Sequence, residues 1–237
     1  MSTGLRAAPA QKKVPSRSTY AVLISLTVTT GVIDAASYIG LGHVFTANMT
    51  GNIVLLGFGL AGAGHLPVLA PLVSLASFLV GSRIGGVLAA RALASGRSRL
   101  SPALLCEGTL VLAAAILAAT ARPRAGSAAG DLVIAALALA MGIRNSTVRK
   151  LAVPDMPTTV LTMTLTGLAS DSHGRSNRRT QLTRLSCVLA MLGGAVAGGL
   201  LVKQQLAGPL WLTAAVALGW RAASAVLWHR DPERGIA

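Results

Sequence analysis

The chain has 237 residues, of which 53% are hydrophobic and only 12% are charged. Soluble domains carry about 25% charged residues, and the mean hydropathy is +0.65, which argues against the globular cytosolic, coiled-coil and disordered classes. The net charge of +14 would suggest a nucleic-acid partner in a soluble chain, but aromatic residues make up only 3% and the basic residues lie between apolar blocks. We therefore predict an all-α integral membrane protein that binds no nucleic acid.

Eight apolar segments follow one another along the chain. A helix needs about 20 apolar residues to cross a bilayer, and six segments reach that length. The other two, 46–62 and 156–170, are short and rich in Thr, Asn and Gly, so we expect them to be broken or re-entrant. The first long segment contains Asp34 and lacks a signal-peptide cleavage pattern, so we expect it to be retained as a span. The eight segments are 19–42, 46–62, 66–92, 101–121, 129–149, 156–170, 182–203 and 208–228.

The distribution of Lys and Arg favours six crossings over eight. If all eight segments cross, the inside loops hold 12 basic residues and the outside loops hold 6. If the two short segments re-enter, the count becomes 15 inside and 3 outside. Basic residues favour the cytoplasmic side of membrane proteins. This predicts a multi-pass membrane protein with both termini in the cytoplasm.

A repeated pattern divides the chain into two halves. The stretch 31–34 (GVID) ends the first long segment, and 142–145 (GIRN) ends the fifth. Each is followed by a short polar stretch, 46–51 (TANMTG) or 162–167 (TMTLTG). Three crossings per half would orient the halves oppositely, which is an inverted repeat. We expect a basic cytoplasmic tail (1–18), a first membrane repeat (19–121), a linker (122–128), a second repeat (129–228) and a cytoplasmic tail (229–237).

Two stretches of the chain resemble a known family. These are GVIDAASYIGLGHVFTANMTGNIVLLG and AMGIRNSTVRKLAVPDMPTTVLTMTLTGLASD, of which NMTGN at residues 48–52 is the most specific part. They are similar to the YoaK family of bacterial membrane proteins, described as a domain of unknown function. The resemblance covers residues 20–228 and implies a multi-pass inner-membrane protein. It implies no established substrate and no catalytic residue.

Five ionisable residues lie inside the apolar blocks. A charge at the centre of a membrane helix costs about 2.5–3.5 kcal/mol on insertion scales, so such residues usually face a partner or a cavity. The repeat places Arg144 near the counterpart of Asp34, so we expect these two residues to pair, either as a gate or proton-linked site or as a structural ion pair. Arg83 is an alternative partner of Asp34. Glu107 and Arg221 lie close enough to segment ends to reach the interface.

Polar residues of the two short segments are candidates for binding a solute, although Thr and Gly there are also consistent with helix packing alone. A lining of amides and hydroxyls suits a small polar or anionic molecule. The candidate binding residues are Asp34, Asn48, Thr50, Asn52, Arg83, Arg144, Asn145, Thr162 and Thr166, and the candidate packing residues are Gly51, Gly81, Gly85, Gly167, Gly194 and Gly198.

The sequence argues against an enzyme. It contains no GxSxG, HExxH or GxxxxGK[ST] motif, and its four histidines flank the apolar segments. We expect no catalytic residue, no metal and no cofactor. The predicted function is transport of a small polar or anionic solute. The alternative is a non-transporting accessory or structural protein that acts through Gly-rich helix packing. Lipids, including anionic lipids, are expected partners, and a homo-oligomer is compatible with the sequence.

Overall fold

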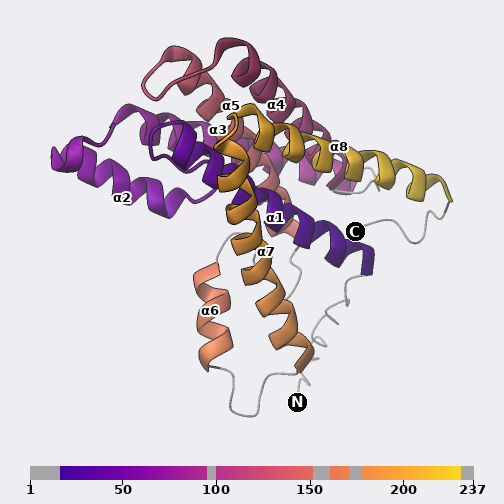
Figure 1. Cartoon of the computed structure of the whole chain (residues 1–237). Helices are drawn as coiled ribbons and strands as arrows, with labels where there is room; N and C mark the ends of the chain where they lie inside the picture. The colour runs from indigo at the N-terminus through magenta and orange to yellow at the C-terminus, as the bar shows by residue number, and fades with distance from the viewer. Residues whose placement is uncertain (1–16, 95–99, 152–160, 171–177, 231–237) are drawn as a thin grey trace, which may run out of the picture.

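The computed structural model describes residues 17–94, 100–151, 161–170 and 178–230, which form helices joined by short turns (Figure 1). Within these ranges there is no strand, so the all-α prediction is confirmed. Two short helices, α2 (Met49–Leu60) and α6 (Leu161–Ser170), and a 3-10 turn, η1 (Ala63–His65), accompany six long helices. The long helices are α1 (Arg17–Gly40), α3 (Leu69–Ala94), α4 (Leu100–Ala121), α5 (Ala128–Leu151), α7 (Arg178–Val202) and α8 (Ala207–Arg230).

The long helices match the thickness of a membrane. The shortest, α4, has 22 residues and therefore extends about 33 Å, against a hydrocarbon core of about 30 Å. By length and apolar composition, α1, α3, α4, α5 and α7 qualify as membrane spans, and α8 is 24 residues long. Large apolar side chains such as Leu79, Leu192 and Leu200 are more than half exposed. These exposed side chains provide the surface that lipid tails cover, so the chain is a multi-pass membrane protein.

The short helices begin later than the apolar segments that predicted them. Helix α2 starts at Met49 because residues 41–48 form an irregular loop after α1, and Asn48 caps the new helix. Helix α6 starts at Leu161, and part of the predicted segment, 156–160, lies outside the described residues. The predicted tails also fall largely outside them. The division into two repeats and a linker stays a prediction at this point.

Two clusters of buried side chains set the relative directions of the helices. One contains Leu23 and Leu26 from the first half of α1, Leu104 from the start of α4 and Val148 from the end of α5. The other joins the last part of α1 and the second half of α4 to the first half of α5 and the start of α8. Helices α1 and α4 therefore run in one direction, and α5 and α8 run in the opposite direction.

Helix α1 packs on α7 at a crossing where the backbones touch. A Cβ atom on Gly198 would lie 2.5 Å from the carbonyl oxygen of Val32, and a Cβ on Gly31 would lie 2.8 Å from the amide nitrogen of Ala195. A Cβ on Gly194 would collide with the carbonyl oxygen of Val28. The residue numbers of the contacting positions increase in the same direction on both helices, so α1 and α7 are parallel. Only glycine permits this approach.

Helix α3 packs on α5 in the same manner. A Cβ on Gly85 would lie 2.5 Å from the carbonyl oxygen of Ile143, and a Cβ on Gly142 would lie 2.8 Å from the amide nitrogen of Ser82. A Cβ on Gly81 would collide with the carbonyl oxygen of Leu139. These two helices are also parallel, and they run opposite to α1 and α7 because α5 opposes α1.

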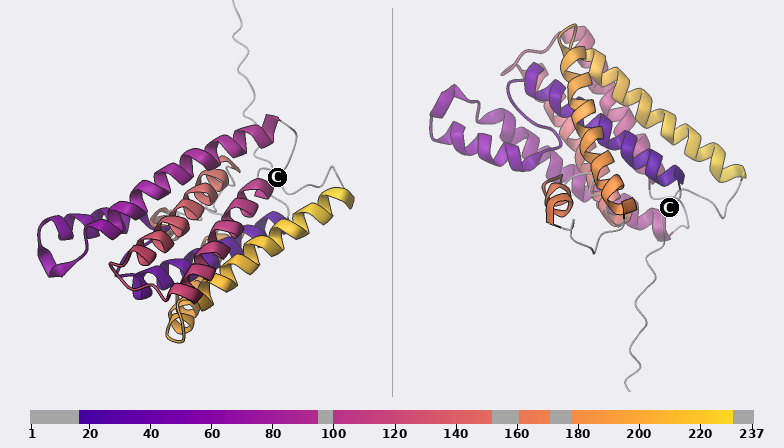
Figure 2. Two further views of the ribbon diagram at one scale, coloured as in Figure 1. Left: turned by 90° about the horizontal axis from the view of Figure 1, so that it is seen from above. Right: turned by 60° about the horizontal axis from the view of Figure 1, so that its bottom comes forward.

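The remaining contacts complete the bundle. Helix α4 packs against α8, where Gly108 faces Leu218, and also against α5, while α1 touches α8. The short helices sit apart from each other: α2 packs on α3, and α6 packs on α7. Figure 2 shows the α2–α3 hairpin and the α6–α7 pair as separate parts of the molecule.

Neighbouring glycines of α7 provide a direct test of the close crossing. Gly194 lies on the backbone of α1, whereas a Cβ on Gly193 would meet nothing within 4 Å. We expect Gly194→Ala to lower the free energy of unfolding by about 1–3 kcal/mol, as overpacked sites do. Gly193→Ala should have no destabilising effect, because alanine favours helix. Thermal unfolding of both variants in detergent, followed by tryptophan fluorescence, measures the difference. Equal unfolding temperatures for the two variants would contradict the close crossing.

Candidate functional site

Three side chains of the charged residue types are buried in the described part of the chain. Asp34 on α1 is 5% exposed, Glu107 on α4 is 0% exposed and Arg144 on α5 is 3% exposed. They lie where α1, α4 and α5 approach one another, in the interior of the bundle. A charge buried inside a membrane protein requires neutralising partners, so the contacts of these three side chains indicate whether each has a structural or a binding role.

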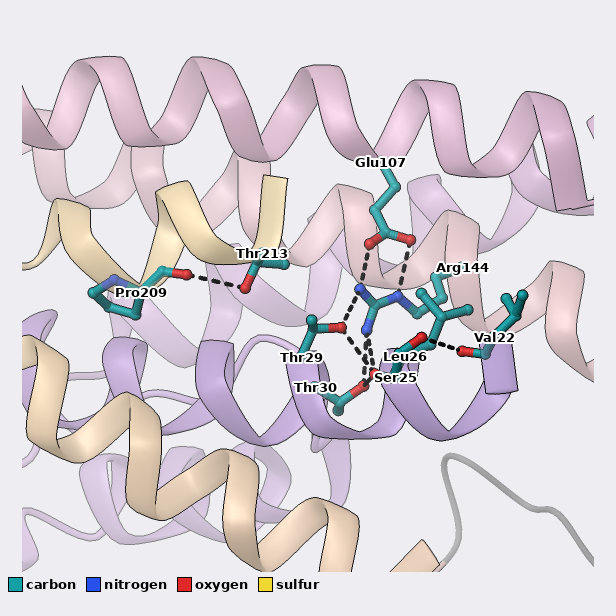
Figure 3. Close-up of polar contacts among 9 residues, drawn as sticks. All are labelled: Val22, Ser25, Leu26, Thr29, Thr30, Glu107, Arg144, Pro209 and Thr213. Carbon is teal, nitrogen blue, oxygen red and sulfur yellow. Dashed lines mark hydrogen bonds and ion pairs between the residues drawn. The ribbon is translucent and has the colours of Figure 1, made fainter. Parts of the chain in front are cut away.

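Arg144 and Glu107 form a bidentate ion pair (Figure 3). The Nε of Arg144 donates to Oε2 of Glu107 at 2.9 Å, and its Nη2 donates to Oε1. The planar guanidinium and the carboxylate match in this arrangement, which gives shorter and stronger hydrogen bonds than neutral groups make. The pair joins α4 to α5 and leaves no net charge.

The other donors of Arg144 bind α1. Nη1 donates to the carbonyl oxygen of Leu26 and to Oγ1 of Thr30, both at 2.9 Å, and Nη2 donates to Oγ1 of Thr29 at 3.0 Å. Each threonine hydroxyl donates its own proton to the Leu26 carbonyl, which leaves its lone pairs free to accept. A guanidinium has five N–H donors, and all five are used here. Arg144 therefore serves as a structural tie with no donor left for a solute in this conformation.

The expected pairing of Asp34 with Arg144 is thus wrong, and so is the expected placement of Glu107 near the interface. Glu107 is fully buried because α4 packs directly on α5, and its carboxylate meets the guanidinium in the bidentate geometry. Arg83 is exposed on α3 and forms no ion pair with Asp34. The exposure of Arg83 follows from its position opposite the glycine face of α3, which is buried against α5.

Asp34 instead holds the loop that separates α1 from α2. Its Oδ1 accepts hydrogen bonds from the amide nitrogens of Thr46, at 3.0 Å, and Ala47, at 2.8 Å. The carboxylate lies in the part of α1 that follows the threonines bound to Arg144, and the backbone N–H of Asn48 and the guanidinium of Arg144 lie near it. Its Oδ2 and the hydroxyl of Thr46 are buried and have no hydrogen-bond partner.

Asn52 fixes the same loop from the side of α2. Its Oδ1 accepts from the amide nitrogen of Phe45 at 2.9 Å, and its Nδ2 donates to the carbonyl oxygen of Phe45 at 2.7 Å. The side-chain amide thus pairs with one residue's backbone as a neighbouring strand would. Nδ2 also donates to Ser74 Oγ at 3.0 Å, and Ser74 donates to the Phe45 carbonyl at 2.7 Å. Loop, α2 and α3 are joined through Asn52.

The other candidate binding residues are spread over several elements. Asn48 and Thr50 are exposed at the start of α2, where Oδ1 of Asn48 accepts from the amide of Gly51 at 3.5 Å. Thr162 and Thr166 are exposed on α6, and Asn145 is partly buried on α5. The structure does not bring the two short helices together, since α2 and α6 pack on different long helices.

The candidate packing glycines occupy two kinds of position. Gly81, Gly85, Gly194 and Gly198 lie at the crossings of the long helices. A Cβ on Gly51 would meet the ring of Phe45, and one on Gly167 would meet the guanidinium of Arg184.

Several partners in this region were not identified from the sequence. They are Thr29, Thr30, Thr46 and Ser74, all buried polar residues. The available signal was the run TVTT at residues 27–30, since three threonines so close together are unusual in a span that needs only apolar side chains. Its meaning depended on knowing that α5 brings an arginine to that turn of α1.

Separating the buried pair should destabilise the protein strongly. Glu107→Gln leaves the guanidinium charge without its counterion, and breaking a buried pair costs about 3–5 kcal/mol. The double variant Glu107→Leu with Arg144→Met removes both charges, so we expect it to regain most of that loss. Thr109→Val, at an exposed position of the same helix, is the matched control and should stay within about 0.5 kcal/mol. Thermal unfolding in detergent measures all three, and a wild-type unfolding temperature for Glu107→Gln would rule out a stabilising pair.

Comparison with known proteins gives two matches. A family model described as "Protein of unknown function (DUF1275)" matches residues 22–223. The UPF0700 transmembrane protein YoaK of Bacillus subtilis (strain 168) is 36% identical over 155 residues, which cover 65% of this chain and 67% of that protein. No solved structure matches the chain.

Proposed function

Since the chain belongs to the YoaK-like family of membrane proteins of unknown function (DUF1275), we propose that it is a carrier for a small polar solute in the bacterial cell membrane. The observation that carries this proposal is the pair of matched glycine crossings. We also propose that the two halves of the chain form an inverted repeat and that both termini lie in the cytoplasm.

The two crossings correspond residue by residue. An offset of 111 relates α1 to α5, so that Gly31, Val28 and Val32 correspond to Gly142, Leu139 and Ile143. An offset of 113 relates α7 to α3, so that Gly194 and Gly198 correspond to Gly81 and Gly85. The glycine contacts then match atom for atom, including both 2.5 Å and both 2.8 Å separations. Composition bias does not produce such agreement, and this supports a duplicated unit.

The directions of the helices support inversion of the two units. Corresponding helices, such as α1 and α5, run oppositely across the bundle, and each half contributes one short helix packed on its third element. Many secondary transporters consist of inverted repeats in which broken helices meet a solute. Irregular backbone at membrane depth persists only where protein buries it or water reaches it. The loop held by Asp34 and Asn52 fits that requirement.

The buried charges favour a polar solute over an anionic one. Arg144 is the only fully buried cation in the described residues, and its five donors are used. An anion would therefore lack a free positive partner there. The amide of Asn48 and the hydroxyls of Thr50, Thr162 and Thr166 are uncharged and unburied, so they remain the proposed solute contacts, one set in each half.

A non-transporting accessory protein is the second candidate. The separation of α2 from α6 favours it, because one central solute site would need the two to approach each other. Carriers change conformation during their cycle, so the carrier proposal requires an arrangement in which these helices come closer. Transport measurements distinguish the two candidates.

The topology can be tested by labelling. In a variant with Cys106 and Cys187 replaced by alanine, single cysteines are introduced on the two sides proposed for six crossings. We expect cysteines at 98 and 176, positions outside the described residues, to react only from the cytoplasm, and those at 127 and 204 only from outside. If positions 98 and 176 react from opposite sides of the membrane, the chain crosses eight times and the inverted repeat is ruled out. The positions are Ser98, Ser176, Ser127 and Gln204.

Transport itself can be tested in liposomes that contain the purified protein. The probes are radiolabelled neutral amino acids, polyols and small carboxylates, and we expect uptake of a neutral polar probe above that of empty liposomes. Asn48→Ala should lower this uptake about tenfold, since losing a hydrogen bond to a buried partner costs about 1–3 kcal/mol. Gln204→Ala removes an exposed amide outside the proposed site and should transport normally. Equal uptake with and without protein for every probe would favour the accessory protein.

A further inference from the structure

We propose that Asp34 and Thr46 form a binding site for one monovalent cation, either a proton or Na⁺. This inference rests on the proposed function in one respect, since it names the coupling ion of the carrier. The binding itself is measured without any solute, so the two proposals can fail independently.

Charge balance is the first argument. The buried Asp, Glu, Lys and Arg side chains of the described residues are Asp34, Glu107 and Arg144. Glu107 and Arg144 neutralise each other, which leaves one negative charge in the interior of a membrane protein. An uncompensated carboxylate at that depth is costly, and one positive charge bound to it would remove the cost.

Unused oxygen atoms are the second argument. Backbone amides of Thr46 and Ala47 occupy Oδ1 of Asp34 and thereby orient the carboxylate, but Oδ2 has no partner. The hydroxyl of Thr46 is also buried, 0% exposed, and unpartnered. Two orphaned oxygens in residues joined by a hydrogen bond are unusual, because buried polar atoms are nearly always bonded. The two oxygens do not bond each other, so a Na⁺ bound between them would use both as ligands, whereas a proton would occupy Oδ2 alone.

A purely structural role of Asp34 explains only one of its two carboxylate oxygens. As a clamp on the loop, Asp34 needs Oδ1 alone, and an asparagine would provide the same acceptor. The proposed counterpart of Asp34 in the second half is a neutral residue, Asn145, at the offset of 111. The negative charge is therefore a property of one half, which gives a single cation site in the molecule.

Few other ionisable groups face this site. Helix α5 contributes Arg144, which is held by Glu107 of α4, and the crossing with α7 contributes only small apolar residues. Lys203 at the end of α7 is exposed. Arg221 of α8 lies at the other end of the bundle, next to Trp220. In the loop, His43 is exposed and stacks edge-on against Tyr38, so its titration needs a control.

The test is the thermal stability of the purified full-length protein in detergent. Wild type is compared in NaCl and in KCl at equal ionic strength, and in KCl over a range of pH. A ligand that binds only the folded state raises the unfolding temperature. We expect a shift of about 3–6 °C, the effect in a chain of this size of a cation present at about ten times its dissociation constant, either from Na⁺ or from lowering the pH. A response to Na⁺ identifies Na⁺ as the cation, and a response to pH alone identifies the proton.

Three variants make the test specific. Asp34→Asn keeps the acceptor for the loop amides and removes the charge, so it should respond neither to Na⁺ nor to pH. If Na⁺ is the cation, Thr46→Val should shift its half-maximal concentration about tenfold upward, and this variant decides the matter if Asp34→Asn does not fold. His43→Gln should respond as wild type does. The proposal is overturned if wild type responds to neither ion or if Asp34→Asn responds as wild type does. It is also overturned if wild type responds to Na⁺ and Thr46→Val responds equally.

Discussion

The interior of this protein depends on satisfying one guanidinium. Arg144 sits on α5 at a depth where water does not compensate for missing hydrogen bonds, so each of its donors needs a protein acceptor. Glu107 on α4 and three oxygens on α1 meet this demand. The consecutive helices α4 and α5 must therefore meet α1, which is distant from them in the sequence, at one level of the bundle. The rotation of each helix about its axis is fixed as well, because turning any of the three would remove hydrogen bonds or the counterion from the Arg144 guanidinium.

Glycine supplies the complementary constraint on the remaining helices. The hydrophobic effect does not drive apolar helices together in lipid, so close packing and polar contacts must do so. Direct backbone contact of α1 with α7, and of α3 with α5, maximises dispersion where no side chain intervenes. Each parallel pair is therefore closely packed at its crossing, whereas Arg144 and the loop at Asp34 provide polar connections between the two pairs.

Hydropathy alone predicted the long helices, because each span must be apolar over a fixed length. The glycine pattern also indicated which faces pack closely. The partner of Arg144 was not predictable in this way, since Asp34 and Glu107 are both single carboxylates in apolar segments. Only the contact between α4 and α5 selects Glu107. Asn52 posed a similar problem: its partner is the backbone of Phe45, and backbone partners leave no trace in side-chain patterns.

The attachment of Phe45 to Asn52 and Ser74 has a mechanical consequence. These bonds fasten the loop to α2 and α3, while the adjacent residues Thr46 and Ala47 are fastened to Asp34 on α1. Two successive parts of one short loop are thus clasped to different helix pairs. Any rocking of one pair against the other must stretch the peptide between Phe45 and Thr46 or release one clasp. The carboxylate of Asp34 accepts charge-assisted bonds, which are stronger than the neutral bonds made by Asn52 and Ser74. A cation that neutralises Asp34 would weaken its hold on the loop and make this clasp the point of release.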